Sequence, residues 1–531
     1  MKNLATSATR NRLFTGRAAG IRQFLLKGIA AAVALAALIW PAIYNGQPFF
    51  LTDTRSYMRA ADAAVYKLTG HATAWTGVET GSPDTGAAAG TRAQPGKPSP
   101  VSSGPRRTRS LAEAAGRGIL LGRSIYYGAL LYLGWITSHF WTTVFLQAAA
   151  ILLVICLALG ALGMRAWPGF FYLALGLGLF SEAPFTASFL MPDVFAGIAI
   201  LSCAVVIARG ERIGVLHSVI LYVLISSAML FHDVILLIVA SLASLYLLIS
   251  LATKSWRSPR RLAILALALF TAFAGHAIFV AMVQRVTGNP PLRPPFLTAR
   301  LIETGYGANY LRATCPVSGF TVCRFASQFP ENSQRFLWAM SKEEGGVFFV
   351  SPMETRRAIS AEDLRFAVAV FRFAPMSFLS DGVLKSFRQL ICFPLDEYQY
   401  EDADARVFDA TFPVELLGPL HRSAAYRHAM PIGALTFANN CFVMLSAAYL
   451  VCVLSFGWPR KLPNGGLRTI AWWVIAGVLL NTLICGFAAT VTPRYEVRVI
   501  WLLPLLVLLS EFQTLAPGAG RLQAVARRNL R

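Results

Sequence analysis

Acidic, basic and aromatic side chains gather in four short stretches of the chain, each beside an apolar run. The stretches are GQPFFLTDTRSYM at 46–58, FSEAPFTASFLMPDVFAG at 180–197, AMLFHDVILL at 228–237 and VTPRYEVRVIW at 491–501. A partly desolvated carboxylate can act as a general base toward a hydroxyl. An Arg side chain can clamp a phosphate through two parallel N–H donors. These groups together suit group transfer from a lipid phosphate.

The candidate catalytic residues are the three carboxylates Asp53, Asp193 and Glu182. A carboxylate can also hold a divalent cation such as Mg²⁺ or Mn²⁺, and Asp53 and Asp193 are the candidate ligands if a metal is used. The candidate substrate-binding residues are Arg55, Tyr57, His232, Arg494, Tyr495 and Arg312. Each group has a structural alternative, since Asp is a favoured helix N-cap and a long Arg side chain can extend toward lipid headgroups.

The composition indicates which elements must position these residues. The chain has 531 residues, of which 56% are hydrophobic and 14% are charged. Globular domains have about 25% charged residues, so a soluble enzyme and any disordered or fibrous class are excluded. We expect an all-α polytopic membrane protein with about 10 (10–12) transmembrane helices and a mostly helical extracytoplasmic subdomain. The expected spans are 21–43, 140–163, 169–187, 193–208, 213–231, 234–252, 262–284, 431–456, 469–490 and 499–515, with 118–137 as a further span or re-entrant segment.

The basic residues predict the orientation of the spans. If the N-terminus is cytoplasmic, the inner tails and short inner loops together hold 19 Lys and Arg against one acid, Glu211. This asymmetry fits the positive-inside rule, with both termini cytoplasmic and both long loops periplasmic, in a bacterial inner membrane. The formal net charge of +22 is then largely a consequence of topology, and nucleic acid is not an expected partner.

The loops divide the chain into five regions. We expect a basic cytoplasmic tail at 1–20, a transmembrane module at 21–286, an extracytoplasmic subdomain at 287–430, a second transmembrane module at 431–515 and a basic tail at 516–531. The stretch at about 72–110 is rich in Gly, Ala, Pro, Ser and Thr, which predicts a disordered insertion in the first outer loop. In the subdomain, Cys315 and Cys323 could form a short-loop disulfide if the outer compartment is oxidising.

The strings LTDTRSYMRAA, GRSIYYGALLYL, LMPDVFAGIAIL and TPRYEVRVIWLLPLL resemble four parts of the GT-C superfamily. In order, these parts are the first-loop acid with its Tyr-containing juxtamembrane helix, the segment before the second span, the second acidic turn and the Arg-Tyr start of a late span. The resemblance covers roughly 20–286 and 431–510. It implies a bacterial-type glycosyltransferase that takes a sugar from a polyprenyl-phosphate donor to an extracytoplasmic glycan or lipid acceptor.

The resemblance also implies residue roles. Asp53 would be the base or metal-binding acid, Asp193 or Glu182 the second acid, and Arg494 a phosphate contact. Asp53 stands in Thr-Asp-Thr and not in a DxD motif, so a metal role stays open.

Three other functions also stay open. An envelope-polysaccharide ligase or polymerase would depend on outer-loop residues such as Arg312 and His421. A transporter or lipid flippase would need a polar path through the bilayer, whereas the middles of the expected spans contain no Asp, Glu, Lys or Arg. A non-catalytic assembly protein predicts that the acids at the outer turns do not converge in space.

Overall fold

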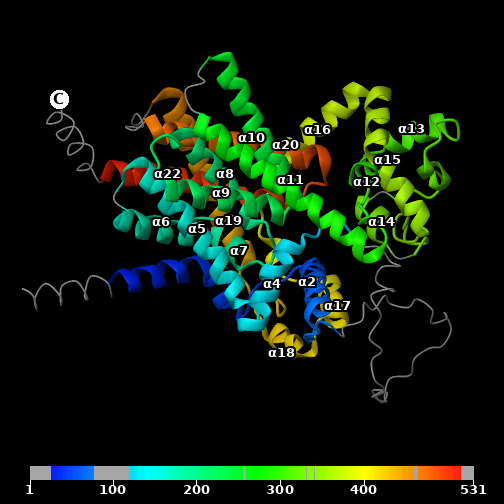
Figure 1. Ribbon diagram of the computed structural model, residues 1–531, viewed down its shortest axis with the longest axis horizontal. Helices are drawn as coiled ribbons and strands as arrows, with labels where there is room; N and C mark the ends of the chain where they lie inside the picture. The colour runs from blue at the N-terminus through cyan, green and yellow to red at the C-terminus, as the bar shows by residue number, and fades with distance from the viewer. Residues whose placement is uncertain are drawn as a thin grey trace, which may run out of the picture.

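The computed structural model describes residues 26–76, 120–164, 166–254, 259–330, 332–339, 341–457 and 465–515. Over these ranges the chain is all-helical and contains no strand (Figure 1). The expected tails at 1–20 and 516–531, and residues 77–110 of the expected disordered insertion, lie outside the described residues.

Seven helices, within the ranges that the structure describes, are long and apolar enough to cross a membrane. They are Leu26–Asn45, α5 (Trp141–Leu162), α10 (Asp233–Ala252), α11 (Pro259–Thr287), α19 with η3 (Ile432–Val451 and Cys452–Phe456), α20 (Gly465–Ala488) and α21 with α22 (Pro493–Ile500 and Leu502–Leu515). Three shorter apolar helices, α6 (Ala166–Phe180), α8 (Val194–Arg209) and α9 (Val215–Phe231), coincide with the other expected spans. A membrane-spanning bundle is therefore supported, while the count of about ten spans stays a prediction.

One of the three shorter apolar helices, α8, lies inside the bundle. Every residue of α8 from Val194 to Ile207 is buried, as is typical of a core helix that is apolar on all sides. Its neighbours approach closely at glycines, because a Cβ at Gly197 would collide with Trp501 and one at Gly477 would collide with Ile200. The core helix α8 is thus packed between the first half of the bundle and its last two spans.

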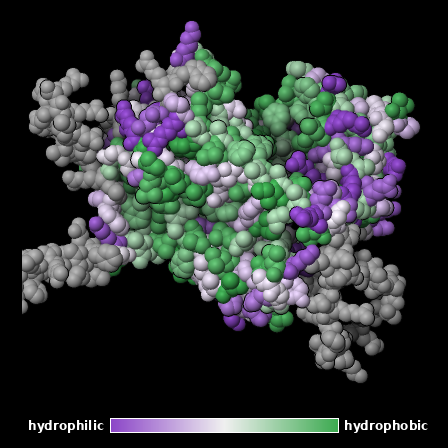
Figure 2. All heavy atoms as spheres, viewed as in Figure 1, coloured by the Kyte–Doolittle hydropathy of each residue, from purple (hydrophilic) through white to green (hydrophobic). Residues whose placement is uncertain are grey.

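The outer helices of the bundle expose apolar side chains instead of burying them. Figure 2 shows hydrophobic residues across the bundle and hydrophilic residues gathered over the lobe beside it. On α11, the exposed side chains include Leu267, Phe270, Phe273, Ile278 and Met282. Such a surface is costly in water and stable in hydrocarbon, which agrees with a membrane protein.

Residues 287–430 divide between two hydrophobic cores. The helices α12 (Phe296–Glu303), α13 (Tyr306–Thr314), η1 (Thr321–Phe325), α14 (Ser333–Trp338) and α15 (Met353–Phe373) surround a core of their own. In contrast, η2 (Asp396–Tyr398), α17 (Asp402–Thr411) and α18 (Val414–Arg422) belong to the core of the bundle. The segment expected as one subdomain therefore has two parts. Its first part, up to α15, forms a separate lobe, and its last part, from η2 to α18, packs into the core of the bundle.

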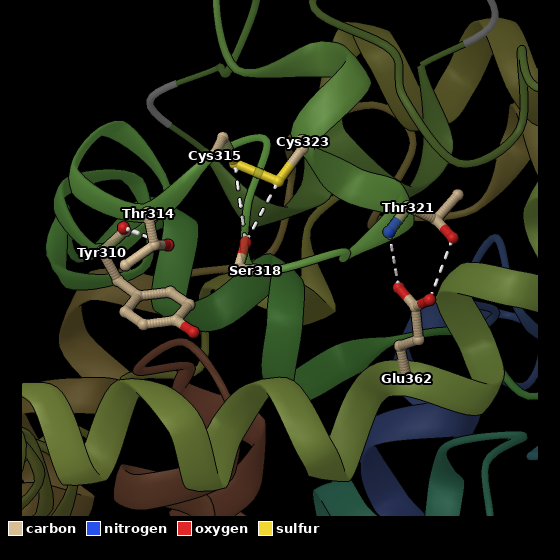
Figure 3. Close-up of a disulfide and its surroundings, with 7 residues drawn as sticks. All are labelled: Tyr310, Thr314, Cys315, Ser318, Thr321, Cys323 and Glu362. Atoms are coloured by element: carbon tan, nitrogen blue, oxygen red, sulfur yellow. Dashed lines mark hydrogen bonds between the residues drawn. A yellow bond between two sulfur atoms is a disulfide. The ribbon is translucent and has the colours of Figure 1, made fainter.

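The lobe is braced by covalent and polar contacts. A disulfide joins Cys315 and Cys323, the pair expected from the sequence (Figure 3). Nearby, Glu362 on α15 accepts hydrogen bonds from the backbone N–H and the hydroxyl of Thr321, at 2.8 and 3.0 Å. These bonds hold the start of η1 against α15.

One buried arginine docks the lobe onto the bundle. The Nε of Arg300, on α12, donates to the carbonyl oxygen of Ala489 at 2.9 Å, just after α20. Its Nη2 forms an ion pair at 3.0 Å with Asp381, on α16 (Pro375–Leu390). Because Arg300 is only 3% exposed, its charge depends on these partners.

We expect Arg300→Met to lower the free energy of unfolding by about 3 kcal/mol, because it removes the docking bonds and leaves the partly buried Asp381 with only its longer pair to Lys385. The matched control is Arg372→Met, at an exposed position of α15 in the same lobe. The control should change stability by no more than about 0.5 kcal/mol. Denaturant titration of the purified protein in detergent, followed by Trp fluorescence, measures both. Equal losses in the two variants would contradict this docking role.

Candidate functional site

Asp53 lies at the start of α2 (Thr54–Thr69), directly after the first span, but its side chain does not cap that helix. Instead, Oδ1 of Asp53 accepts a hydrogen bond from Nη2 of Arg123 at 2.6 Å. Arg123 precedes α4 (Ile125–Ser138), the helix that occupies the expected re-entrant segment. With its side chain 27% exposed, Asp53 is a fixed carboxylate that a substrate can reach.

Asp193 lies before α8 and likewise makes no cap bond. Its Oδ1 is 3.4 Å from Nη1 of Arg498, and both side chains are almost completely buried. Arg498 also donates from Nε and Nη2 to Oδ1 of Asn481, at 3.1 and 2.7 Å. This network joins the start of α8 to α20 and α21.

Arg494 lies one helical turn before Arg498 on α21, so the two side chains share a face. Its Nε is 3.7 Å from Oε2 of Glu397, which is close enough for an ion pair but too far for a hydrogen bond. The Nε and Nη1 atoms of Arg494 are buried and have no hydrogen-bond partner. The charge of Arg494 also interacts with those of Asp193 and Asp53. A buried guanidinium with unused donors is suited to bind an anion.

Glu397 is a member of the site that the sequence did not indicate. It lies on η2, in the outer segment, and reaches the bundle because the ring of Tyr398 is packed among Phe49, Phe185 and Phe189 at 5.0–5.2 Å. Burial raises the pKa of Glu397, while the nearby Arg494 opposes that shift. The only sequence signal was the run DEYQYED at 396–402, in which pairs of acidic residues flank two tyrosines.

Tyr57 lies among members of the three ion pairs of the site. Its ring is buried on α2, packs edge-on against Tyr127 at 5.4 Å, and lies 5.9 Å from the guanidinium carbon of Arg123. Burial raises the pKa of its hydroxyl, and the charges that act on that hydroxyl are those of Arg123, Asp53, Asp193 and Arg494. The three ion pairs therefore belong to one electrostatic neighbourhood.

His232 lies at the junction of α9 and α10. Its Nδ1 accepts a hydrogen bond from the backbone N–H of Val234 at 3.2 Å and so caps α10. The charges of Asp193 and Arg494 act on the ring, which places His232 beside the same neighbourhood. The Nδ1 atom of His232 is therefore occupied by a hydrogen bond that stabilises the start of α10.

We call this group the polar cluster. Its members are Asp53, Tyr57, Arg123, Asp193, His232, Glu397, Arg494 and Arg498.

Glu182 is not a solvated turn residue but a fully buried one. It lies in the break between α6 and the short helix α7 (Ala183–Ser188), and neither carboxyl oxygen has a hydrogen-bond partner. Burial raises the pKa of Glu182 to about 8. At neutral pH the carboxyl group is therefore mostly protonated, and no hydrogen bond links it to the polar cluster.

Of the remaining candidates, two lie near the polar cluster and one lies in the lobe. Arg55 lies on α2, half-buried, where its charge interacts with that of Asp53. The ring of Tyr495 faces the guanidinium carbons of both Arg494 and Arg498, at 5.4 and 5.2 Å. Arg312 is exposed on α13, in the lobe and away from α7 and α8 (Figure 1). The structure thus groups all candidate binding residues except Arg312 with Asp53 and Asp193.

A divalent cation does not fit the two expected metal ligands. Asp53 and Asp193 are each paired with an arginine, and an arginine is a poor neighbour for a cation. No group of three or more His, Cys, Asp or Glu side chains, among the residues that the structure describes, is arranged to hold a metal ion.

Comparison with known proteins leaves the function to be argued from this geometry. No family model matches the chain, and neither a curated protein nor a solved structure is similar to it. What the polar cluster offers chemically is one accessible carboxylate, one arginine with unused donors, and buried pairs that fix both.

We expect the stability of the protein to fall as pH rises from about 4.5 to about 8, because Glu182 must ionise in a buried site while its unfolded form ionises near pH 4.5. Glu182→Gln removes this penalty. The variant should unfold at a higher temperature than wild type at pH 9 and at a similar temperature at pH 5. Thermal unfolding in detergent at both values measures the difference, with the exposed Glu343→Gln as control. A pH dependence unchanged by Glu182→Gln would contradict the assignment.

Proposed function

We propose that the protein is a membrane glycosyltransferase that moves a sugar from a polyprenyl-phosphate donor to an extracytoplasmic glycan or lipid acceptor. The observation that carries the proposal is Arg494, whose buried guanidinium has unused donors in the same cluster as the accessible carboxylate of Asp53. A phosphate clamp and a base at one end of a membrane bundle are the two groups that this transfer needs.

The reaction can be written with the residues of the cluster. Asp53 takes the proton of an acceptor hydroxyl, and the acceptor oxygen forms a bond to the anomeric carbon of the sugar. The bond between that carbon and the phosphate oxygen breaks, and the electron pair leaves with the polyprenyl phosphate. Arg494 binds the phosphate and stabilises the negative charge that develops on it. Attack from the side opposite the phosphate inverts the anomeric configuration.

The buried members of the cluster have positioning roles in this proposal. The pair of Asp193 and Arg498 fixes α21, and with it the backbone that carries Arg494. Glu397 holds the Arg494 guanidinium through an ion pair at 3.7 Å. Arg123 orients the carboxylate of Asp53 toward the accessible side.

The proposal includes a membrane orientation. About ten spans, the three shorter apolar helices included, would place the polar cluster at the periplasmic face of a bacterial inner membrane, with both termini cytoplasmic. The opposite end of the bundle supports this, since its turns carry basic residues such as Arg209, Arg212 and Lys254.

An envelope-polysaccharide ligase or polymerase is the second candidate. The observation in its favour is an exposed pair in which Nε2 of His421, on α18, is 2.7 Å from Oδ1 of Asp409, on α17. A non-catalytic assembly protein is disfavoured, because the acids Asp53 and Asp193 do converge on one cluster.

We expect Asp53→Asn to lower transfer activity by roughly 10²–10⁴-fold, because the amide cannot accept the hydroxyl proton. Membranes containing the protein would be supplied with radiolabelled polyprenyl-phosphate hexose or pentose, and transfer of label to the acceptor fraction would be measured. Asp402→Asn, an exposed acid at the start of α17, is the matched control and should stay active. Activity retained by Asp53→Asn but lost by His421→Ala would favour the ligase instead.

We expect Arg494→Lys to raise the KM for the lipid-linked donor by about tenfold, because an ammonium keeps the charge but loses the bidentate geometry. Arg494→Gln should lose more activity, since it removes the charge as well. Arg312→Gln, in the lobe, should leave the donor KM unchanged. An unchanged KM in Arg494→Gln would show that this guanidinium does not bind the donor.

A further inference from the structure

The helix α16 has one strongly apolar face that no part of the described chain covers. Six large side chains on it are between 43% and 76% exposed: Met376, Leu379, Val383, Leu384, Phe387 and Ile391. Their spacing of three, four and seven residues places them on one side of the helix. An apolar stripe of this length on a folded chain marks a surface that meets another apolar phase.

The opposite face of α16 is packed against α20. A Cβ at Gly382 would collide with the ring of Phe487, and one at Gly486 would collide with Ser386. Farther along, the side-chain amide of Gln389 is buried, where it donates to the carbonyl of Thr492 and accepts from its N–H, at 2.9 and 3.0 Å. These contacts fix the rotation of α16, so the apolar stripe points away from the bundle.

Two of the three charged residues of α16, Asp381 and Lys385, are kept off the stripe, whereas Arg388 is exposed at its edge, one turn after Leu384. Asp381 pairs with Arg300 at 3.0 Å and with Lys385 at 3.5 Å, on the flank beside α12. The one polar residue within the stripe is Ser380, whose hydroxyl donates to the backbone carbonyl of Ser377 at 3.1 Å. Apart from Arg388 at its edge, the stripe therefore has no side chain that needs water as a partner.

The stripe continues the lipid-facing surface of a span. On α20, Leu479 and Leu483 are 44% and 43% exposed, and they lie two turns and one turn before Gly486, the residue that meets α16. α15 and α16 meet at an angle of 110°, which is the geometry of a broken span or a re-entrant segment. Figure 1 places α16 beside α20 at the junction of bundle and lobe, and Figure 2 shows hydrophobic atoms in that region.

We propose that α16 is embedded in the membrane and that its uncovered face is occupied by lipid acyl chains. The lobe would then be attached to the lipid by α16 and to the bundle by Arg300. The end of α16 is bonded to Thr492, two residues before Arg494, so this attachment would also set the position of the lobe relative to the polar cluster. The inference stands on α16 and α20 alone and does not depend on the proposed reaction.

The test places a photoreactive residue on the stripe of the full-length protein. Phe387 and, in a separate variant, Val383 are replaced by p-benzoylphenylalanine, which reacts with nearby C–H bonds. Each protein is reconstituted in vesicles of phosphatidylethanolamine and phosphatidylglycerol with radiolabelled acyl chains and is then irradiated. The control is the same replacement at Val317, an apolar residue that is 94% exposed in the lobe and lies outside α16.

We expect the variants with the photoreactive residue at position 383 or 387 to become covalently labelled by the radioactive lipid. The variant with this residue at position 317 should stay unlabelled. Equal labelling at all three positions would overturn the proposal, as would no labelling at 383 and 387. A crosslinked dimer without lipid label would assign the stripe to a second copy of the chain and would also overturn it. A circular dichroism spectrum and a thermal unfolding midpoint that match wild type verify that each variant has folded.

Discussion

The bonds of Arg498 to Asn481 and Asp193 are the interaction on which the rest of the site depends. Arg498 and Asp193 are almost wholly buried, where an unpaired charge would strongly destabilise the folded protein. Asn481 satisfies the guanidinium from α20, and Asp193 balances its charge from the start of α8. Three helices are held together by one arginine, and the turn that carries Arg494 is oriented as a consequence.

Aromatic packing supplies the second constraint. The ring of Tyr398 fills a space among Phe49, Phe185 and Phe189, and the hydroxyl of Tyr400 accepts the backbone N–H of Phe50 at 3.0 Å. These contacts bind the segment after the lobe to the loop that follows the first span. Glu397 is carried to Arg494 by the packing of its neighbour, so apolar contacts position a charged group.

Much of the bundle could be predicted from the sequence, because apolar length and basic flanks are local properties of the chain. Each expected span coincides with an apolar helix, although α6, α8 and α9 are shorter than a full crossing. The site was predicted only in part. Asp53, Asp193 and Arg494 carried a signal as charges beside spans, whereas Glu397 and Arg123 reach the cluster through tertiary contacts with no local pattern. The apolar face of α16 was also missed, because charged residues on its other flank mask it in a linear window.

The sequence by itself determined that the chain is helical and membrane-like, that basic residues gather at one end of its spans, and that Cys315 and Cys323 are close enough along the chain to pair. Only the tertiary structure decided which charges are partners. In the folded protein Asp53 pairs with Arg123, and Asp193 pairs with Arg498, so neither acid caps a helix. The carboxyl group of Glu182 is buried without a hydrogen-bond partner. The physical reason is that the hydropathy of a segment depends on its own residues alone. Ion pairing and burial depend instead on which helices pack side by side.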